Sequence, residues 1–313
     1  MHDWSKMQSD SRGLPELAEI PVRYFARRCQ ADPNLWGVKA GIRVTHSGQS
    51  RPVVGFSCGE EPEAAWQRAR SELFERLLTA WLKMSWAEAS FRESVAPSTA
   101  AAIESLIGRD ATGLAFHPDS SQARAHATFE LMERHILGRI WYDDLRIQPL
   151  ESSPRWSAPN VETALYTTVR QVELGHFVLS SIYDKRNEIF VVGSAIRETM
   201  NEAAEHAWEE AAVMHDSQLN DSQSPYVRPQ SRERHRSLRG ALSKDRFRHL
   251  QSKVGSTGEG GMRAIAVPSR LAREQLVQTS VGCLVRSWVP TGDFALVSDY
   301  RAANTDIVRD PFC

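Results

Sequence analysis

One stretch of this chain is more informative than its composition: residues 59–76 read Gly-Glu-Glu-Pro-Glu-Ala-Ala-Trp-Gln-Arg-Ala-Arg-Ser-Glu-Leu-Phe-Glu-Arg. Proline and acids stand at its start, where the first turn of a helix tolerates proline and favours negative charge. Apolar residues then keep helical spacing to about Leu82, so the stretch predicts a helix. Glu72 and Glu75 are three residues apart and share one face of it, with Arg76 beside them.

The same Glu-x-x-Glu-Arg motif returns 58 residues later as Glu130-Leu-Met-Glu133-Arg134. It lies in a second predicted helix, over residues 118–141, whose start is rich in acids and hydroxyls. Strand-like runs precede both helices, as a hairpin over 36–56 and a short buried strand over 112–117. This arrangement indicates an internal duplication of a strand–helix unit.

Further elements are expected along the rest of the chain. A third helix should begin at Thr199 and carry Glu205, Glu209 and Glu210 among alanines. The other expected elements are a short helix at 97–107 and strands at 163–174, 177–183, 189–194 and 282–289. Because strands and helices alternate, we expect an α/β fold of the mixed α+β type.

Changes in composition predict the domain boundaries. Residues 1–35 are short and polar and are interpreted as an N-terminal extension, followed by one domain over 36–313. A polar and basic connector with a helical centre is expected inside it at about 215–261. Its basic part, residues 228–248, either contacts a triphosphate, an acidic peptide or nucleic acid, or faces solvent.

Composition and charge argue against several classes of protein. The 38 Lys and Arg against 39 Asp and Glu leave a formal net charge of −1, which gives no support for a whole-protein nucleic-acid or membrane binder. The N-terminus is unlike a secretory signal, and no apolar run reaches membrane-spanning length. Four widely spaced cysteines are typical of reduced thiols. We expect a globular cytoplasmic protein.

The doubled motif leaves three interpretations open on the residues alone. Mg²⁺ takes a few carboxylates together with phosphate oxygens and waters, which two helices with paired glutamates would supply. Glu and Arg also form helices well, so the same spacing is typical of a solvated, salt-bridged face. His126, His135 and His206 lie on the same predicted helices and keep a transition-metal site open. Neither a P-loop motif nor a Gly-x-Gly-x-x-Gly after a strand is present.

The ordered set of motifs resembles the YcaO family. Residues 59–76 are similar to the family's first glutamate motif, and residues 112–134 are similar to its second. Residues 203–211 resemble its third helix, which carries a further acidic ligand, and residues 285–292 resemble its late strand and turn. The motifs stand in the family's order from about residue 55 to the end of the chain.

This resemblance implies an enzyme that uses ATP and Mg²⁺ to phosphorylate the oxygen of a peptide backbone amide. In the family a Cys, Ser or Thr side chain then gives an azoline, sulfide gives a thioamide, and an amine gives an amidine. We expect a cyclodehydratase that makes azolines in the synthesis of ribosomal peptide natural products. The duplicated units would place the glutamate-bearing helices around the nucleotide.

The resemblance also implies which residues form the site. The expected Mg²⁺ and ATP ligands are Glu72, Glu75, Glu130, Glu133 and Glu210. His206 and Arg286 are expected to contact the nucleotide, and Arg134 to orient phosphate or an acid. Arg134 is expected to act in catalysis, together with Cys313 if the C-terminal tail reaches the active site rather than fraying.

The chain departs from the family's pattern at Arg68, Thr112, His135 and His206, where the family often has Ser, Asn, Asp and Gln. These departures motivate an alternative, a catalytically degenerate scaffold subunit of a peptide-modifying complex. The expected partners are a precursor peptide, a separate leader-peptide-binding protein and a second copy of the chain, with a dehydrogenase as a further candidate. No nucleic-acid or membrane partner is expected.

Overall fold

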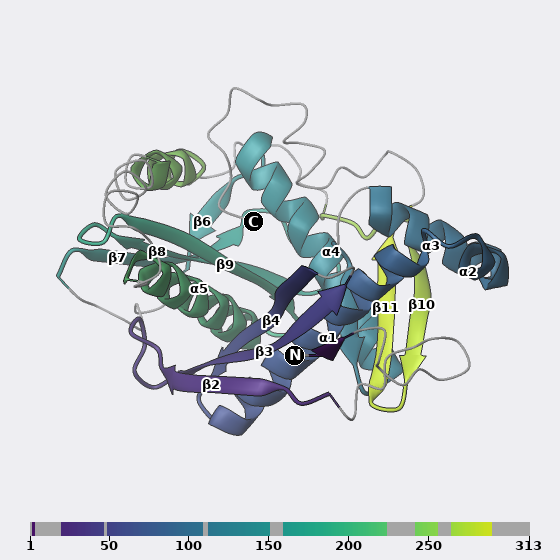
Figure 1. Cartoon of the computed structure of the whole chain (residues 1–313). Helices are drawn as coiled ribbons and strands as arrows, with labels where there is room; N and C mark the ends of the chain where they lie inside the picture. The colour runs from purple at the N-terminus through teal and green to yellow at the C-terminus, as the bar shows by residue number, and fades with distance from the viewer. Residues whose placement is uncertain are drawn as a thin grey trace. The chain divides into compact units, whose positions relative to one another are not determined.

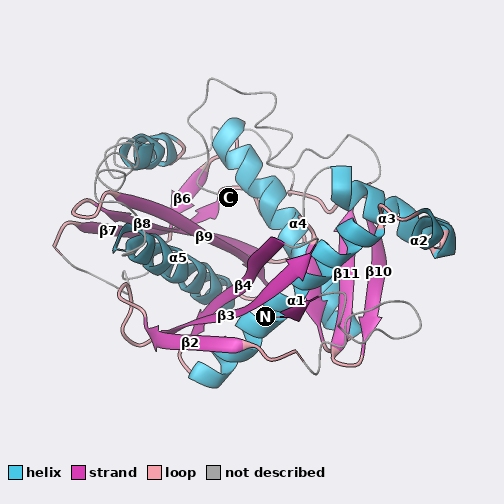
Figure 2. Ribbon diagram, in the orientation of Figure 1, coloured by secondary structure: helices cyan, strands magenta, loops and turns pink. Residues whose placement is uncertain are grey.

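The computed structural model describes residues 2–3, 20–46, 49–108, 112–150, 159–223, 242–255 and 264–289. The chain divides into two compact units. Figure 1 labels their helices and strands. The first consists of Met1–Arg27, Trp36–Leu131 and Pro268–Asp293, and the second of Arg28–Leu35, Met132–Val267 and Phe294–Cys313. The elements confirm the expected mixed α/β fold (Figure 2).

The first unit begins with a sheet built on a long hairpin. Strands β3 (Trp36–His46) and β4 (Gln49–Gly59) pair antiparallel in unbroken register from Trp36 with Gly59 to His46 with Gln49. This confirms the predicted hairpin. Strands β1 (His2–Asp3) and β2 (Arg23–Arg28) also pair with β3. Along β3, buried Val38, Ala40, Ile42 and Val44 alternate with outward side chains, as a strand with one covered face requires.

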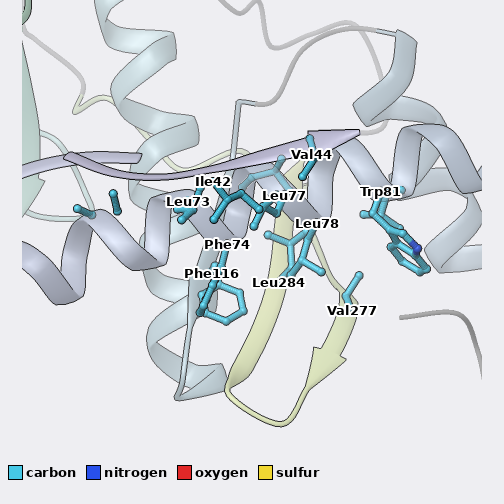
Figure 3. Close-up of a cluster of buried hydrophobic side chains, with 14 of the residues drawn as sticks. Ile42, Val44, Leu73, Phe74, Leu77, Leu78, Trp81, Phe116, Val277 and Leu284 are labelled. Atoms are coloured by element: carbon cyan, nitrogen blue, oxygen red, sulfur yellow. The ribbon is translucent and has the colours of Figure 1, made fainter. Parts of the chain in front are cut away.

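Helix α1 (Pro62–Ser85) covers that sheet and forms the core of the first unit. Its proline lies in the first turn, as the sequence predicts, and the helix ends three residues beyond the expected Leu82. Leu73, Leu77 and Leu78 are fully buried (Figure 3). Phe74 meets the ring of Phe116 edge to face, with centroids 5.5 Å apart.

Two short helices and a second sheet complete the first unit. Helices α2 (Ala89–Ser94) and α3 (Pro97–Gly108) follow α1. Strands β5 (Leu114–His117), β10 (Ala272–Thr279) and β11 (Gly282–Trp288) form an antiparallel sheet in the order β10-β11-β5. The late hairpin therefore pairs with a strand far earlier in the chain, and Leu284 and Val277 add to the core around α1.

Helix α4 (Ser120–Tyr142) is shared between the units, with residues up to Leu131 in the first and those from Met132 in the second. The Asp119 carboxylate caps its start by accepting the backbone N–H groups of Ser121 and Gln122 at 2.8 and 2.9 Å. The predicted acid-rich helix start is thus confirmed.

The second unit contains an antiparallel meander covered by a helix. Strands β6 (Ile147–Pro149), β7 (Val161–Thr168), β8 (His176–Asp184) and β9 (Ile189–Arg197) are adjacent in chain order. Helix α5 (Met200–Gln223) packs on β8 and β9, and starts with a capping box between Thr199 and Glu202. A further helix over 242–252 places Phe247 against Tyr183, with ring centroids 4.6 Å apart.

Several elements differ from the sequence predictions. Helix α5 continues to Gln223, past residue 215 where the connector was expected to begin. Strand β2 lies in the expected N-terminal extension, and β10 and α2 were not predicted. The strand expected over 163–174 ends at Thr168. Residues 224–241 and 256–261 of the connector, and the tail after residue 289, lie outside the described residues.

Among the helices that the structure describes, none combines the length and apolar character that crossing a membrane would need.

Candidate functional site

Three of the predicted glutamates come together in the first unit. Glu72 and Glu75 project from α1, and Glu130 from α4. The charges of Glu72 and Glu130 both act on the Glu75 carboxyl. Burial raises the pKa of Glu75 well above its ordinary value, and these two neighbouring charges raise it further. This group of carboxyls, which we call the first glutamate group, is therefore poised to gain from a nearby cation.

Strand backbone fixes the positions of two of these carboxyls. Glu72 Oε2 accepts the backbone N–H of Phe56 at 2.5 Å, and Glu75 has a hydrogen bond with the backbone of Phe116. Phe56 lies on β4, which pairs with β3, and Phe116 lies on β5, the last strand in the order β10-β11-β5. Arg76 forms an ion pair with Glu72 and opposes the rise in the pKa of Glu75.

A second glutamate group, Glu133 and Glu210, lies in the second unit. Glu210 Oε2 accepts the backbone N–H of Ser194 at 2.6 Å, and Glu133 Oε1 accepts that of Ile196 at 2.8 Å. Ser194 and Ile196 are two residues apart on β9, the last strand of its sheet, so their N–H groups point the same way. Arg197 Nη1 lies 3.7 Å from Glu133 Oε1.

Burial raises the pKa of Glu133 to about 8. The charge of Glu210 raises it as well, whereas the cations Arg197 and Arg134 and the Ile196 hydrogen bond lower it. The side chain of Glu133 is 14% exposed. Without a bound cation, this carboxyl therefore holds its proton through most of the neutral range.

The two glutamate groups share one construction. In both units a strand amide is bonded by a helix glutamate 16 residues later, Phe56 by Glu72 and Ser194 by Glu210. In both, a glycine immediately precedes that amide and lies against the helix backbone. A Cβ at Gly55 would come closer than 3.0 Å to backbone atoms of Ala69 and Leu73, and one at Gly193 would do so to backbone atoms of Ala207 and Ala211. The glycines bring helix and strand close enough for the carboxylate to reach.

We expect Gly55→Ala to destabilise the protein by about 3 kcal/mol, because the new methyl group would meet helix backbone that can move only as a whole. Urea unfolding measures the change. Gly41→Ala is the matched control, since its Cβ would make only ordinary contacts, the nearest being the Val53 carbonyl oxygen at 3.5 Å. Equal stabilities of the two variants would contradict this account of the strand–helix approach.

The structure places the remaining predicted site residues as follows. Arg286, 1% exposed on β11, donates from Nη2 to Ser105 Oγ at 3.2 Å. His206 lies one turn before Glu210 on α5, with Nδ1 3.2 Å from Glu209 Oε2. Arg134 is half-buried and acts on Glu133. Cys313 lies outside the described residues.

Sequence reasoning missed Arg197. The available signal was its position directly after the Ser194–Ile196 segment of β9.

The donor chemistry of both glutamate groups fits Mg²⁺. All the ligands offered are carboxylate oxygens, and the raised pKa values reflect burial and neighbouring carboxyls, whose cost to the ionised form a divalent ion would offset. In the part of the chain that is described, no three His, Cys, Asp or Glu residues are arranged to hold a metal by themselves. Mg²⁺ commonly takes only one or two carboxylates and completes its shell with phosphate oxygens and waters.

Known structures share this fold. YcaO from Methanopyrus kandleri, solved with AMPPCP and Mg²⁺, aligns over 93% of this chain and 89% of its own with a TM-score of 0.55 and 14% identity. The Escherichia coli microcin synthetase McbBCD complex contains a chain that aligns over 93% of this chain and 96% of its own, with a TM-score of 0.55 and 12% identity. A heterocyclase in complex with substrate and cofactor aligns over 88% of this chain and 50% of its own, with a TM-score of 0.56 and 10% identity. Comparison with curated protein sequences finds no match.

The family model described as YcaO cyclodehydratase, ATP- and Mg²⁺-binding, matches residues 89–276, which is more than half of the sequence. The chain therefore belongs to the YcaO family. This confirms the resemblance, and with it ATP and Mg²⁺ as the cofactors at the level of the family. Glu130, Glu133 and Glu210 lie inside the matched range, whereas Glu72 and Glu75 precede it.

Proposed function

We propose that this chain is an enzyme that uses ATP and Mg²⁺ to phosphorylate the oxygen of a peptide backbone amide, after which a neighbouring Cys, Ser or Thr side chain closes an azoline ring. Family membership supports the reaction class. The observation that carries the proposal for this chain is the pair of glutamate groups, each anchored to strand amides and each with a carboxyl whose pKa is raised.

The proposed Mg²⁺ and ATP ligands are Glu72, Glu75 and Glu130 of the first group and Glu133 and Glu210 of the second. Bound Mg²⁺ would supply positive charge beside the transferring phosphoryl group. Strand amides hold Glu72, Glu75, Glu133 and Glu210 in place before any ligand arrives. The charges of Arg197 and Arg134 lower the pKa of Glu133. Contact of His206 and Arg286 with the nucleotide stays a prediction. So does a catalytic role for Cys313 in the C-terminal tail.

The chemistry balances as a cyclodehydration. The amide oxygen takes the γ-phosphoryl group and ADP is released. The thiol or hydroxyl adds to the amide carbon, and phosphate departs with the former amide oxygen. The nucleophile and the amide nitrogen each lose a proton, so the peptide loses the elements of one water molecule. Attack by external sulfide or an amine would instead give a thioamide or an amidine.

The proposed partners are a precursor peptide and a separate protein that binds its leader segment, with a dehydrogenase and a second copy of this chain as further components. Similar proteins give this support: the E. coli microcin synthetase is solved as a complex, and the heterocyclase is solved with its substrate. The complex and the bound substrate are those of the microcin synthetase and the heterocyclase. For this chain the partners are a proposal.

Calorimetric titration with ATP in the presence of Mg²⁺ tests the proposal. We expect saturable binding that requires Mg²⁺, and ATP hydrolysis stimulated by a peptide rich in Cys, Ser and Thr. A peptide encoded beside the gene is the preferred probe. Absence of nucleotide binding, even with the partner protein present, would contradict the proposal that this chain is an ATP-dependent enzyme.

One observation favours the second candidate, a degenerate scaffold subunit. Arg68 lies one turn before Glu72 on α1, which adds a fixed cation to the stripe that carries Glu72 and Glu75. Its Nη2 donates to the Cys58 carbonyl oxygen at 2.5 Å. In a reconstituted complex, a scaffold would leave product formation unchanged when its glutamates are replaced, whereas an enzyme would not.

A further inference from the structure

The sheet of the first unit has an outward face opposite α1, which we call the cationic face and define by Arg23, Phe25, Lys39 and Arg43. The inward residues identify it. Tyr24 of β2 packs on Trp66 of α1 with ring centroids 4.8 Å apart, so its strand neighbours Arg23 and Phe25 point the other way.

The same reasoning places the β3 members of the face. Val38, Ala40, Ile42 and Val44 are buried in the core with α1, so Lys39 and Arg43 between them point outward. Arg23, Phe25, Lys39 and Arg43 are all exposed. Because β2 and β3 are hydrogen-bonded neighbours, the four side chains belong to one continuous surface.

The charge of these strands has a single sign. Strands β2, β3 and β4 contain no Asp or Glu, and their charged residues are Arg23, Arg27, Arg28, Lys39, Arg43 and Arg51. The whole chain, by contrast, has a formal net charge of −1. Strand β1 of the same sheet adds one acid, Asp3, which pairs with Thr45 of β3, so the strands of this sheet still carry a clear excess of positive charge. Such a local excess within a nearly neutral protein attracts an acidic partner and steers its approach.

An aromatic side chain lies within this charged surface. Phe25 is 61% exposed, and in the described residues the other exposed large hydrophobic side chain is Ile107, at 40%. Lys39 Nζ lies 5.0 Å from the centre of the Phe56 ring, so the cations also border aromatic surface on β4. Aromatic residues and arginine are enriched in protein interfaces, where a few residues carry most of the binding energy.

We propose that the cationic face binds an acidic segment of the peptide substrate, with an apolar side chain of that segment seated on Phe25. This inference rests on the proposed function in one respect, because it assigns the acidic segment to the peptide that the enzyme modifies. Sheets that read single-stranded nucleic acid stack successive bases on two or three aromatic rings, and this face exposes one. A peptide with alternating acidic and apolar residues matches both features of the surface.

Fluorescence anisotropy with the full chain tests this assignment. The probe is a labelled peptide of about twelve residues with a repeating Glu-Glu-Leu sequence, long enough at ~3.3 Å per residue to cross both strands. Its Gln-Gln-Leu counterpart and a single-stranded oligothymidine of similar length are the comparison probes. We expect the acidic peptide to bind most tightly, and its affinity to fall as salt is raised.

Arg23→Glu and Phe25→Ala should each weaken acidic peptide binding about tenfold. Arg186→Glu, in the turn after β8, is the matched control, because it makes the same charge change at an exposed arginine of the other unit and should alter binding less than about twofold. Circular dichroism checks that each variant is folded.

Three outcomes would overturn the inference: an equal loss in Arg186→Glu, equal binding of the Gln-Gln-Leu peptide, or tighter binding of the oligothymidine. Self-association that is lost in Phe25→Ala would reassign the face to a contact between copies and would overturn it too. The assay contains no ATP or Mg²⁺. Glu75→Gln should therefore bind the peptide normally, and failure of nucleotide binding would remove the proposed reaction while leaving peptide docking intact.

Discussion

Glu75→Gln and Glu133→Gln are each expected to lower peptide-stimulated ATP hydrolysis by about a hundredfold or more. Each substitution removes a carboxylate ligand of the proposed Mg²⁺, whose positive charge would stabilise the transferring phosphoryl group. Glutamine has nearly the shape of a protonated glutamate and keeps an oxygen for the strand amide. The fold should therefore survive, and release of phosphate from ATP measures the loss.

Glu63→Gln is the matched control, because Glu63 is an exposed glutamate in the first turn of the same helix as Glu75. It should retain normal turnover. If the glutamates served only to hold strands and helices together, all three variants would hydrolyse ATP alike. Thermal unfolding at neutral pH provides the second readout: Glu75→Gln should be at least as stable as the parent, since the substitution removes repulsion from Glu72 and Glu130.

The contribution of Glu133 to the stability of the cation-free protein should fall as pH rises from about 4.5 to about 8. In the folded chain Glu133 keeps its proton up to a pKa of about 8, whereas in the unfolded chain it releases the proton near its ordinary value of 4.5. The folded state binds more protons in this interval, so rising pH favours unfolding, by up to roughly 4 kcal/mol from this carboxyl. Urea unfolding across the interval measures the slope.

Glu133→Gln should flatten this pH dependence and leave a smaller slope in the same direction, because the pKa of Glu75 is raised as well. Glu205→Gln, at an exposed position on α5, should keep the full slope. Binding of ATP with Mg²⁺ should expel the retained protons, which calorimetry in buffers of different ionisation enthalpy detects as proton release. Stability that rises with pH through this interval would contradict the burial assigned to Glu133.

Local signals in the sequence predicted the helices well. Proline and acids mark the start of α1, and a hydroxyl-rich turn led by Asp119, whose carboxylate accepts a backbone N–H, marks the start of α4. Both signals lie within a few residues of the helix start. The β3–β4 hairpin was likewise predictable, because its partners are close in sequence and alternate buried and exposed residues.

Non-local features could not be predicted in the same way. Strand β5 finds its partner in β11, whose residues lie more than 160 positions later, and nothing in the four residues of β5 encodes that choice. Strand β2 reads as a run of arginines and aromatics, which is not the alternation expected of a half-buried strand.

The Glu-x-x-Glu-Arg motif identified glutamates that the structure brings together, but it did not identify which helices share the same geometry. The sequence pairs α1 with α4 through Glu-x-x-Glu-Arg at 58 residues, and that duplication stays a prediction. The matched geometry in the structure instead relates α1 to α5, through a strand glycine and a glutamate that bonds the following amide. This bond needs only one glutamate on each helix. The similarity between α1 and α5 therefore has no Glu-x-x-Glu spacing that a sequence motif could detect.

The bonds between carboxylates and strand amides also bear on which ion the chain would accept. Oε2 of Glu210 accepts the Ser194 amide and Oε1 of Glu133 accepts the Ile196 amide, so one oxygen of each carboxylate already shares its lone pairs with a strand N–H. Larger ions such as Ca²⁺ commonly draw both oxygens of a carboxylate into a shell of six to eight ligands, whereas Mg²⁺ takes six ligands in a compact octahedron. At the proposed site these bonds would disfavour bidentate contact between a carboxylate and an ion, so we expect Mg²⁺ to bind ahead of Ca²⁺.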